Sequence, residues 1–179
     1  MRKKLFLDMD GTIAKFYEDA DCLELMFVPG FFVNLRPYFN VVDGIRVFLR
    51  KYILRPEDIF VVSAADQTIF DQVVEEKRRW LRVNCGFVPE ENCIFIAVGE
   101  NKAEAVQKKI GEISKDFILL DDYNQHLHDW EKAGGTSVKL VNEINDRGSK
   151  GGSLWSGKRI RYDFTADRIC EELTKIIEE

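Results

Sequence analysis

Residues 5–16 read LFLDMDGTIAKF, and this stretch carries an apolar run directly into two carboxylates and a glycine. A short apolar run that stops at a turn signal is typical of a buried β-strand. Asp8 keeps the geometry of that strand, whereas Asp10 already lies in the turn, whose backbone angles Gly11 permits. The stretch therefore predicts a strand that delivers two carboxylates, at positions i and i+2, to one end of a sheet.

The composition is that of a soluble globular protein, with 179 residues, 45% of them hydrophobic and 32% charged. This length predicts one domain, residues 1–179, that buries a core without disulfides. The formal net charge of -5 argues against a nucleic acid polymer or a membrane as partner, but not against a small phosphorylated ligand. The apolar run 5–7 is too short for a signal peptide, and the four scattered cysteines form no CxxC pair, so we expect a cytoplasmic protein with reduced, mostly buried thiols.

Four further apolar segments have the length and composition of strands. They are IFVVSAA at 59–65, CIFIAV at 93–98, FILL at 117–120 and SVKLV at 137–141. Strands that are apolar on both faces are typical of parallel sheets covered by helices. Helical patterns separate the strands, at 42–53, 67–84, 102–114 and 124–133, and a last helix follows a capping Thr165. The alternation predicts an α/β fold with a doubly wound, parallel, five-stranded, Rossmann-like sheet.

Two segments interrupt this alternation. Residues 15–40 are rich in aromatic side chains and lie between the first strand and the first crossover helix, so we expect a small helical or loop cap inserted into the domain. Residues 143–158, EINDRGSKGGSLWSGK, are polar and rich in glycine and are expected to form a long loop. Loops of this length in compact domains are usually functional or mobile.

Polar side chains follow the ends of the predicted strands. Asp8 ends the first strand, Ser63 lies near the end of the second, Asp121 and Asp122 follow the fourth, and Lys102 opens the helix after the third. In open α/β sheets, ligands bind outside the carboxyl ends of the strands. A single aspartate at a strand end more often caps a helix or a turn, but four such coincidences at one edge predict a functional site.

The acidic residues at this edge predict a metal site. Clustered carboxylates repel one another and need a cation, and oxygen ligands are those that Mg²⁺ prefers. We assign Asp8, Asp10, Asp121 and Asp122 to a magnesium site, and which of the last two touches the metal is left open.

The remaining residues at the edge suit a phosphate group. Lys102 adds positive charge for an anionic substrate. The hydroxyl of Ser63 and backbone N–H groups, for which Met9 and Ala64 are the candidates, hold phosphate oxygens.

Together these parts predict phosphoryl transfer through an aspartyl-phosphate. Asp8 attacks phosphorus, and Asp10 protonates the leaving oxygen and later activates water. Lys102 and Ser63 stabilise the charge that develops on the phosphate oxygens.

The four motifs resemble those of the haloacid dehalogenase superfamily. They are DMDGT at 8–12, Ser63 after FVV, Lys102, and LLDD at 119–122, and the resemblance covers residues 1–141. In that superfamily the second aspartate marks phosphatases and phosphotransferases and is missing from dehalogenases, which implies the acid–base role for Asp10.

Within the superfamily, the chain resembles the cytosolic type C 5'(3')-deoxyribonucleotidases. The likeness rests on the short insert with PGFF at 29–32, on the following DGI…FL helix, and on LLDDYN at 119–124. It implies a nucleoside monophosphate as substrate and a role for Phe31 and Phe32 in stacking on the base. The alternative for these two residues is that they form the core of the cap.

Other functions stay open at this point. The same core is compatible with hydrolysis of a sugar phosphate, a flavin phosphate or another metabolite, because the cap alone carries the substrate information. A module that binds a phosphorylated ligand without catalysis is a further alternative, and a homodimer is left open.

Two further patterns are weaker. GSLWSGK at 152–158 approaches a phosphate-binding P-loop, but Arg159 takes the Ser/Thr position and the segment lies far from the first strand. His126 and His128, at i and i+2 on a predicted helix, point to different faces, so we expect surface or internally paired histidines instead of metal ligands.

Overall fold

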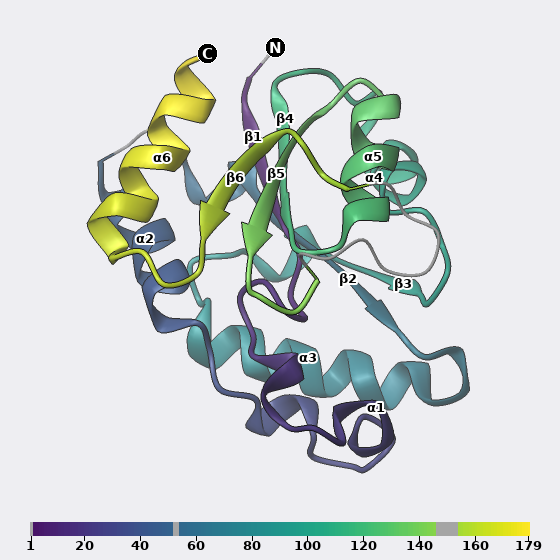
Figure 1. Ribbon diagram of the computed structural model, residues 1–179. Helices are drawn as coiled ribbons and strands as arrows, with labels where there is room; N and C mark the ends of the chain where they lie inside the picture. Colours follow the sequence, from purple (N-terminus) through teal and green to yellow (C-terminus); the bar gives the residue numbers. More distant parts are fainter. Residues whose placement is uncertain (1, 52–53, 146–153) are drawn as a thin grey trace.

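The computed structural model describes residues 2–51, 54–145 and 154–179. Its centre is a parallel sheet with the strand order β3-β2-β1-β4-β5-β6 (Figure 1). The strands are β1 (Lys4–Leu7), β2 (Ile59–Ala65), β3 (Cys93–Ala97), β4 (Phe117–Asp121), β5 (Thr136–Val141) and β6 (Lys158–Arg161). All five strands expected from the sequence are present and parallel, which confirms the predicted fold class.

The prediction of five strands is wrong by one, because β6 adds a sixth strand beside β5. Its sequence, KRIR, has a single apolar residue, Ile160, which is the one fully buried position of the strand. A strand at the sheet edge needs little apolar surface, so its sequence lacks the pattern of the central strands. Lys158 thus begins a strand, whereas we expected it to end a loop. Residues 146–153 of that loop lie outside the described residues.

Helices cover both faces of the sheet (Figure 1). Leu5 and Leu7 of β1 point to one face and Phe6 to the other, as the two-residue period of a strand requires. The helices of the first face are α2 (Phe39–Arg50), α3 (Phe70–Asn84) and α6 (Ala166–Glu178), and those of the second are α4 (Lys102–Ile110) and α5 (Asn124–Lys132). The side chain of Thr165 accepts a hydrogen bond from the N–H of Arg168, which confirms the predicted cap of α6.

The chain between β1 and α2 forms short elements beyond the carboxyl ends of the strands (Figure 1). They are the 3₁₀ turns Phe16–Glu18 and Phe32–Asn34 and the helix α1 (Cys22–Leu25). A small apolar cluster joins this segment to the core: Phe16, Cys22 and Phe32 pack with Ala65 of β2 and Val73 of α3.

All four cysteines are unpaired and buried, as expected. None of the helices in the described ranges combines the length and the apolar character needed to cross a membrane.

Candidate active site

The turn after β1 brings Asp8 to the carboxyl edge of the sheet. The N–H of Asp8 donates to the carbonyl of Leu120 at 2.9 Å, which extends the pairing of β1 with β4 by one residue. Gly11 then adopts φ = 83°, a conformation that favours glycine. A β-carbon on Gly11 would collide with the carboxylate of Asp122 and the ring of Tyr17. The glycine predicted for this turn is therefore needed for its backbone angles and for the close approach of Asp122.

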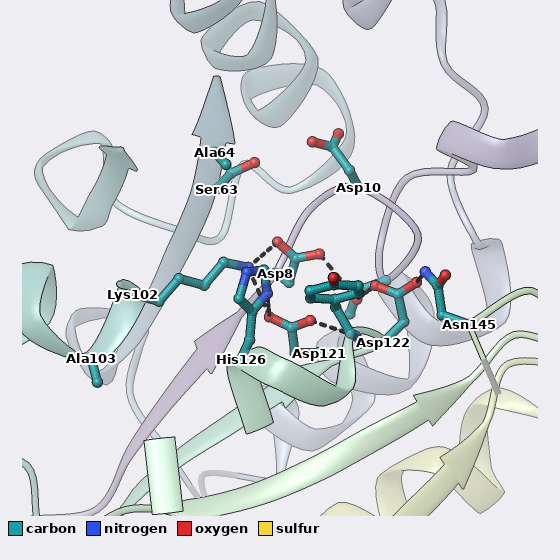
Figure 2. A network of polar contacts seen from close by, with 12 residues as sticks. Asp8, Asp10, Ser63, Ala64, Lys102, Ala103, Asp121, Asp122, His126 and Asn145 are labelled. Carbon is teal, nitrogen blue, oxygen red and sulfur yellow. Dashed lines mark hydrogen bonds and ion pairs between the residues drawn. The ribbon is translucent and has the colours of Figure 1, made fainter. Parts of the chain in front are cut away.

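Three carboxylates meet at this edge (Figure 2). Asp8, Asp121 and Asp122 each offer an oxygen atom within 4.8 Å of the others, and all three side chains are buried. The hydroxyl of Thr12 lies between two of them, 3.3 Å from Oδ2 of Asp8 and 3.4 Å from Oδ1 of Asp122. Three of the four predicted metal ligands thus form one cluster.

Lys102 reaches this cluster from the start of α4. The side chain of Asn101 caps the helix by accepting hydrogen bonds from the N–H groups of Ala103 and Glu104, and so fixes where Lys102 begins it. The buried ammonium of Lys102 donates to Oδ1 of Asp8 and, at 2.7 Å, to Oδ2 of Asp121. Burial acts to lower the pKa of Lys102, but the two carboxylates outweigh it and hold that pKa above its ordinary value.

Asp121 is the best neutralised member of the cluster. Besides Lys102, it has Nδ1 of His126 at 3.0 Å, and its Oδ1 accepts from the N–H of Tyr123 at 2.8 Å. Burial acts to raise its pKa, but Lys102 and His126 outweigh burial, so the pKa of Asp121 lies below its ordinary value.

Asp122 is held by polar partners, and the buried ammonium of Lys139 donates to its backbone carbonyl oxygen at 2.6 Å. Its Oδ2 accepts from the amides of Asn142 at 2.7 Å and Asn145 at 2.6 Å. Burial, with repulsion from Asp8 and Asp121, raises the pKa of Asp122 to about 8. Burial likewise raises the pKa of Asp8 to about 6, and Lys102 only partly opposes this rise.

These features fit a divalent cation. The cluster offers three carboxylates, which are the hard oxygen ligands that Mg²⁺ prefers, and one lysine neutralises them only in part. A cation among them would lower the pKa values of Asp8 and Asp122 and stabilise their charged forms.

Asp10 lies apart from this cluster. Figure 2 shows its carboxylate directed away from Asp8, and its Oδ2 pairs instead with the ammonium of Lys77 from α3. The same ammonium donates to Oγ of Ser63 at 2.9 Å and to the carbonyl of Ala64 at 2.5 Å. The side chain of Asp10 is therefore placed with the predicted phosphate-binding residues, whereas Met9 is buried in the turn between the two aspartates.

A cavity of about 650 Å³ opens over both groups of residues. Its lining includes Asp8, Asp10, Lys102 and Asp122, together with Ala64. The other residues that line it are Phe16, Tyr17, Leu23, Met26, Phe32, Val98, Gly99, Glu100, Asn101, Tyr123, Gln125, His126 and Asp129. The cavity thus lies between the sheet edge and the segment that follows β1.

The two aromatic residues predicted to stack on a base lie at different places. Phe32 lines the cavity, but it is only 2% exposed, and its ring packs against Phe16 at 6.0 Å between centroids. Phe31 lines a separate cavity beside Lys15, and its ring meets Phe32 edge-on at 5.2 Å. Their role in stacking stays a prediction.

Several residues of the site were not identified from the sequence. Lys77 lies on the buried face of the helix expected at 67–84, and a lysine among the apolar residues of that face was the available signal. His126 was expected to be a surface or internally paired residue and does pair internally, with Asp121. Asn142 directly precedes the segment expected to be a loop and Asn145 lies within it, and no motif marks either residue.

The parallel sheet with this strand order and helices on both faces is a Rossmann-like fold of the haloacid dehalogenase type. Solved structures that resemble the chain include hydrolases of the haloacid dehalogenase type, which confirms the fold that the sequence motifs implied. No protein-family model and no curated protein sequence matches the chain.

Three of these structures show how far the likeness extends. A family IA, variant 3 hydrolase from Entamoeba histolytica has a TM-score of 0.61 at 13% identity, with 99% of this chain and 100% of that chain covered. D,D-heptose 1,7-bisphosphate phosphatase from Burkholderia thailandensis has a TM-score of 0.58 at 13% identity, with 96% of this chain and 99% of that chain covered. The D,D-heptose 1,7-bisphosphate phosphatase from B. bronchiseptica, complexed with magnesium and phosphate, has a TM-score of 0.58 at 17% identity. Here 96% of this chain and 98% of that chain are covered. At these identities the likeness shows the fold alone.

Proposed function

We propose that this protein is a magnesium-dependent phosphomonoester hydrolase that works through a phosphorylated Asp8. The observation that carries the proposal is the buried cluster of Asp8, Asp121 and Asp122, with Lys102 on Asp8, beside a cavity that Asp8, Lys102 and Asp122 line. Asp8, Asp121 and Asp122 would hold Mg²⁺, which when bound supplies the positive charge that lets a phosphate approach a carboxylate.

The first step is attack by a carboxylate oxygen of Asp8 on phosphorus. A bond between this oxygen and phosphorus forms while the bond from phosphorus to the ester oxygen breaks, and Asp10 gives that oxygen its proton. Lys102 stabilises the charge at the transferring group, as its contact with Asp8 places it beside the reacting oxygen.

The second step returns Asp8 to its starting form. Asp10, now ionised, takes a proton from water, and the water oxygen attacks the phosphorus of the aspartyl-phosphate. The bond from phosphorus to Asp8 breaks, and inorganic phosphate leaves the cavity. Both steps need an acid–base group that is separate from the nucleophile, and Asp10 lies apart from Asp8 in this way.

For the substrate, we propose a nucleoside monophosphate. The cavity volume of about 650 Å³ is in the usual range for small-molecule sites. Among the described residues that line it, Lys102 is the only lysine or arginine, while the carboxylates of Glu100 and Asp129 also belong to the lining. A second phosphate would meet these carboxylates, so the lining favours one phosphate group attached to an uncharged, partly aromatic body.

A panel of phosphomonoesters tests this proposal. Activity is expected to vanish when a chelator removes divalent metal and to return with Mg²⁺. Nucleoside monophosphates are expected to exceed sugar phosphates, flavin phosphate and bisphosphates by at least about tenfold in kcat/KM. A sugar phosphate or flavin phosphate at the head of the ranking would remove the nucleotidase proposal and keep the phosphatase. Ligand binding without turnover of any ester would support a non-catalytic module instead.

The role of Phe31 and Phe32 has its own test. If they stack on the base, the double variant Phe31→Ala, Phe32→Ala should lower kcat/KM for a nucleotide. The loss of transition-state stabilisation should be about 1–3 kcal/mol for each lost stacking contact. A small aryl phosphate should be affected little. Val33→Ala, on the same 3₁₀ turn and 37% exposed in the wild type, is the matched control. Equal losses for both esters together with a lower Tm would identify the two phenylalanines as cap core.

A further inference from the structure

Helix α3 places a second buried lysine beside the candidate active site. The side chain of Lys77 is 0% exposed, and its ammonium contacts Asp10 and Ala64, two residues that line the cavity. Its three N–H donors have three acceptors: Oδ2 of Asp10, Oγ of Ser63 and the carbonyl oxygen of Ala64. The ammonium is therefore fully paired, and each partner lies at a position that the proposed reaction uses.

The packing around Lys77 does not need a charge. Val73 and Trp80, one turn before and one turn after it, are buried apolar residues of the same helix face. An apolar side chain of similar length would continue this stripe, but it would leave the carboxylate of Asp10 without its ion-pair partner and the oxygens of Ser63 and Ala64 without their donor. The apolar stripe therefore does not account for the ammonium of Lys77, whereas its three polar partners do.

What the ammonium does fix is the position of Asp10. Oδ2 of Asp10 pairs with Lys77, while its buried Oδ1 has no hydrogen-bond partner among the described residues. In an in-line displacement the leaving oxygen lies on the side of phosphorus opposite the nucleophile. A carboxylate that protonates this oxygen must therefore be held away from Asp8, and Figure 2 shows Asp10 directed in that way.

The neighbouring residue of α3 ties the same turn to the segment after β1. Glu76 accepts hydrogen bonds from the N–H groups of Gly30 at 2.8 Å and Phe32 at 3.1 Å. The ring of Phe32 in turn lies 4.6 Å from the ammonium of Lys77. The wall of the cavity and the carboxylate of Asp10 are thus both anchored on one turn of α3.

We propose that Lys77 is a positioning residue for the reaction: it holds the carboxylate of Asp10 on the leaving-group side of the cavity and the hydroxyl of Ser63 beside it. This inference rests on the proposed phosphatase function, in which Asp10 is the acid. Lys77 itself acts through Asp10 and Ser63.

The variant Lys77→Met tests the proposal with two esters. An alkyl phosphate has a poor leaving group that needs a proton, whereas p-nitrophenyl phosphate has a good one that does not. In single-turnover experiments, cleavage of the alkyl ester should slow by about 10²-fold or more, the usual contribution of a general acid, and nitrophenol release should slow far less. Magnesium binding, measured by calorimetry, should persist, because Lys77 is not in contact with the carboxylate cluster.

Glu76→Gln is the matched control, since it alters the adjacent buried residue and leaves Lys77 in place. It should change the rates for the two esters by the same factor. An equal loss for both esters in Lys77→Met, or no loss, would overturn the positioning role.

A crystal structure of Lys77→Met gives a reading that does not depend on activity. The carboxylate of Asp10 should leave the orientation that it has beside Lys77, and an unchanged orientation would overturn the proposal even if the chain proves to hydrolyse neither ester. Wild-type protein that cleaves neither ester would contradict the proposed function, whereas wild-type cleavage with an ester-independent loss in Lys77→Met would contradict the role of Lys77 alone.

Discussion

The variant Asp8→Asn is expected to lose turnover by at least about a thousandfold while keeping its fold. An amide cannot act as the nucleophile, so no aspartyl-phosphate forms. The fold should tolerate the change because burial already raises the pKa of Asp8 to about 6 and so disfavours its charge. Lys102 keeps Asp121 as a partner at 2.7 Å when the charge of Asp8 is removed.

Steady-state kinetics and thermal melting measure the two halves of this prediction. A beryllium fluoride adduct, which mimics the phosphorylated aspartate, should form on the wild type with Mg²⁺ and be absent from the variant. Asp43→Asn is the matched control, since Asp43 lies on α2 and pairs at the surface with Arg46. Full magnesium-dependent activity in Asp8→Asn would contradict the proposed mechanism.

The central fold was predictable because each signal for it is local in the sequence. The strand of residues 5–7 and the aspartate after it are adjacent, and the rule that ligands bind at the carboxyl ends of parallel strands then places the other motifs. Asp121 and Lys102 follow from the same rule, and the structure brings both to Asp8. Strand β6 was not predictable in this way, because an edge strand with one buried residue has no distinctive pattern.

The missed parts of the site depend on contacts between distant segments. Lys77 reaches Asp10 across 67 positions of the chain, and Asn142 reaches Asp122 across 20. Periodicity places Lys77 on a buried helix face, but it does not say what lies opposite. The carboxylate of Asp10 was expected among the metal ligands for the same reason: spacing in a turn does not fix the direction of a side chain, and a partner on α3 does.

The second prediction with a large expected effect concerns the variant Asp122→Asn, which should lower activity but raise the stability of the metal-free protein. In metal-free protein the pKa values of Asp8 and Asp122 are about 6 and about 8, above their ordinary value of 3.8. The folded state therefore binds more protons than the unfolded state between about pH 4 and pH 8. In this range the contribution of these two groups to the free energy of unfolding falls as the pH rises.

Asp122→Asn removes the group with the larger rise in pKa, and with it the larger part of the stability that is lost as the pH rises. Without metal at pH 8, we expect the variant to exceed the wild type in stability by about 1–3 kcal/mol, and the difference should vanish near pH 4. Added Mg²⁺ should raise the Tm of the wild type and have little effect on the variant, because ligand binding stabilises only the state that binds it. Turnover of the variant should fall by about a hundredfold or more, as expected when a metal ligand is lost.

Asp121→Asn is the control that separates this electrostatic origin from a general effect of removing a carboxylate. Lys102 and His126 hold the pKa of Asp121 below its ordinary value, so its charge contributes stability above about pH 4 that is lost as the pH falls. Asp121→Asn should therefore destabilise the metal-free protein at pH 8, where Asp122→Asn stabilises it. Melting curves in the presence of a chelator decide the point. If both variants melt below the wild type, the charge of Asp122 is already balanced without metal, and the cluster does not need a cation.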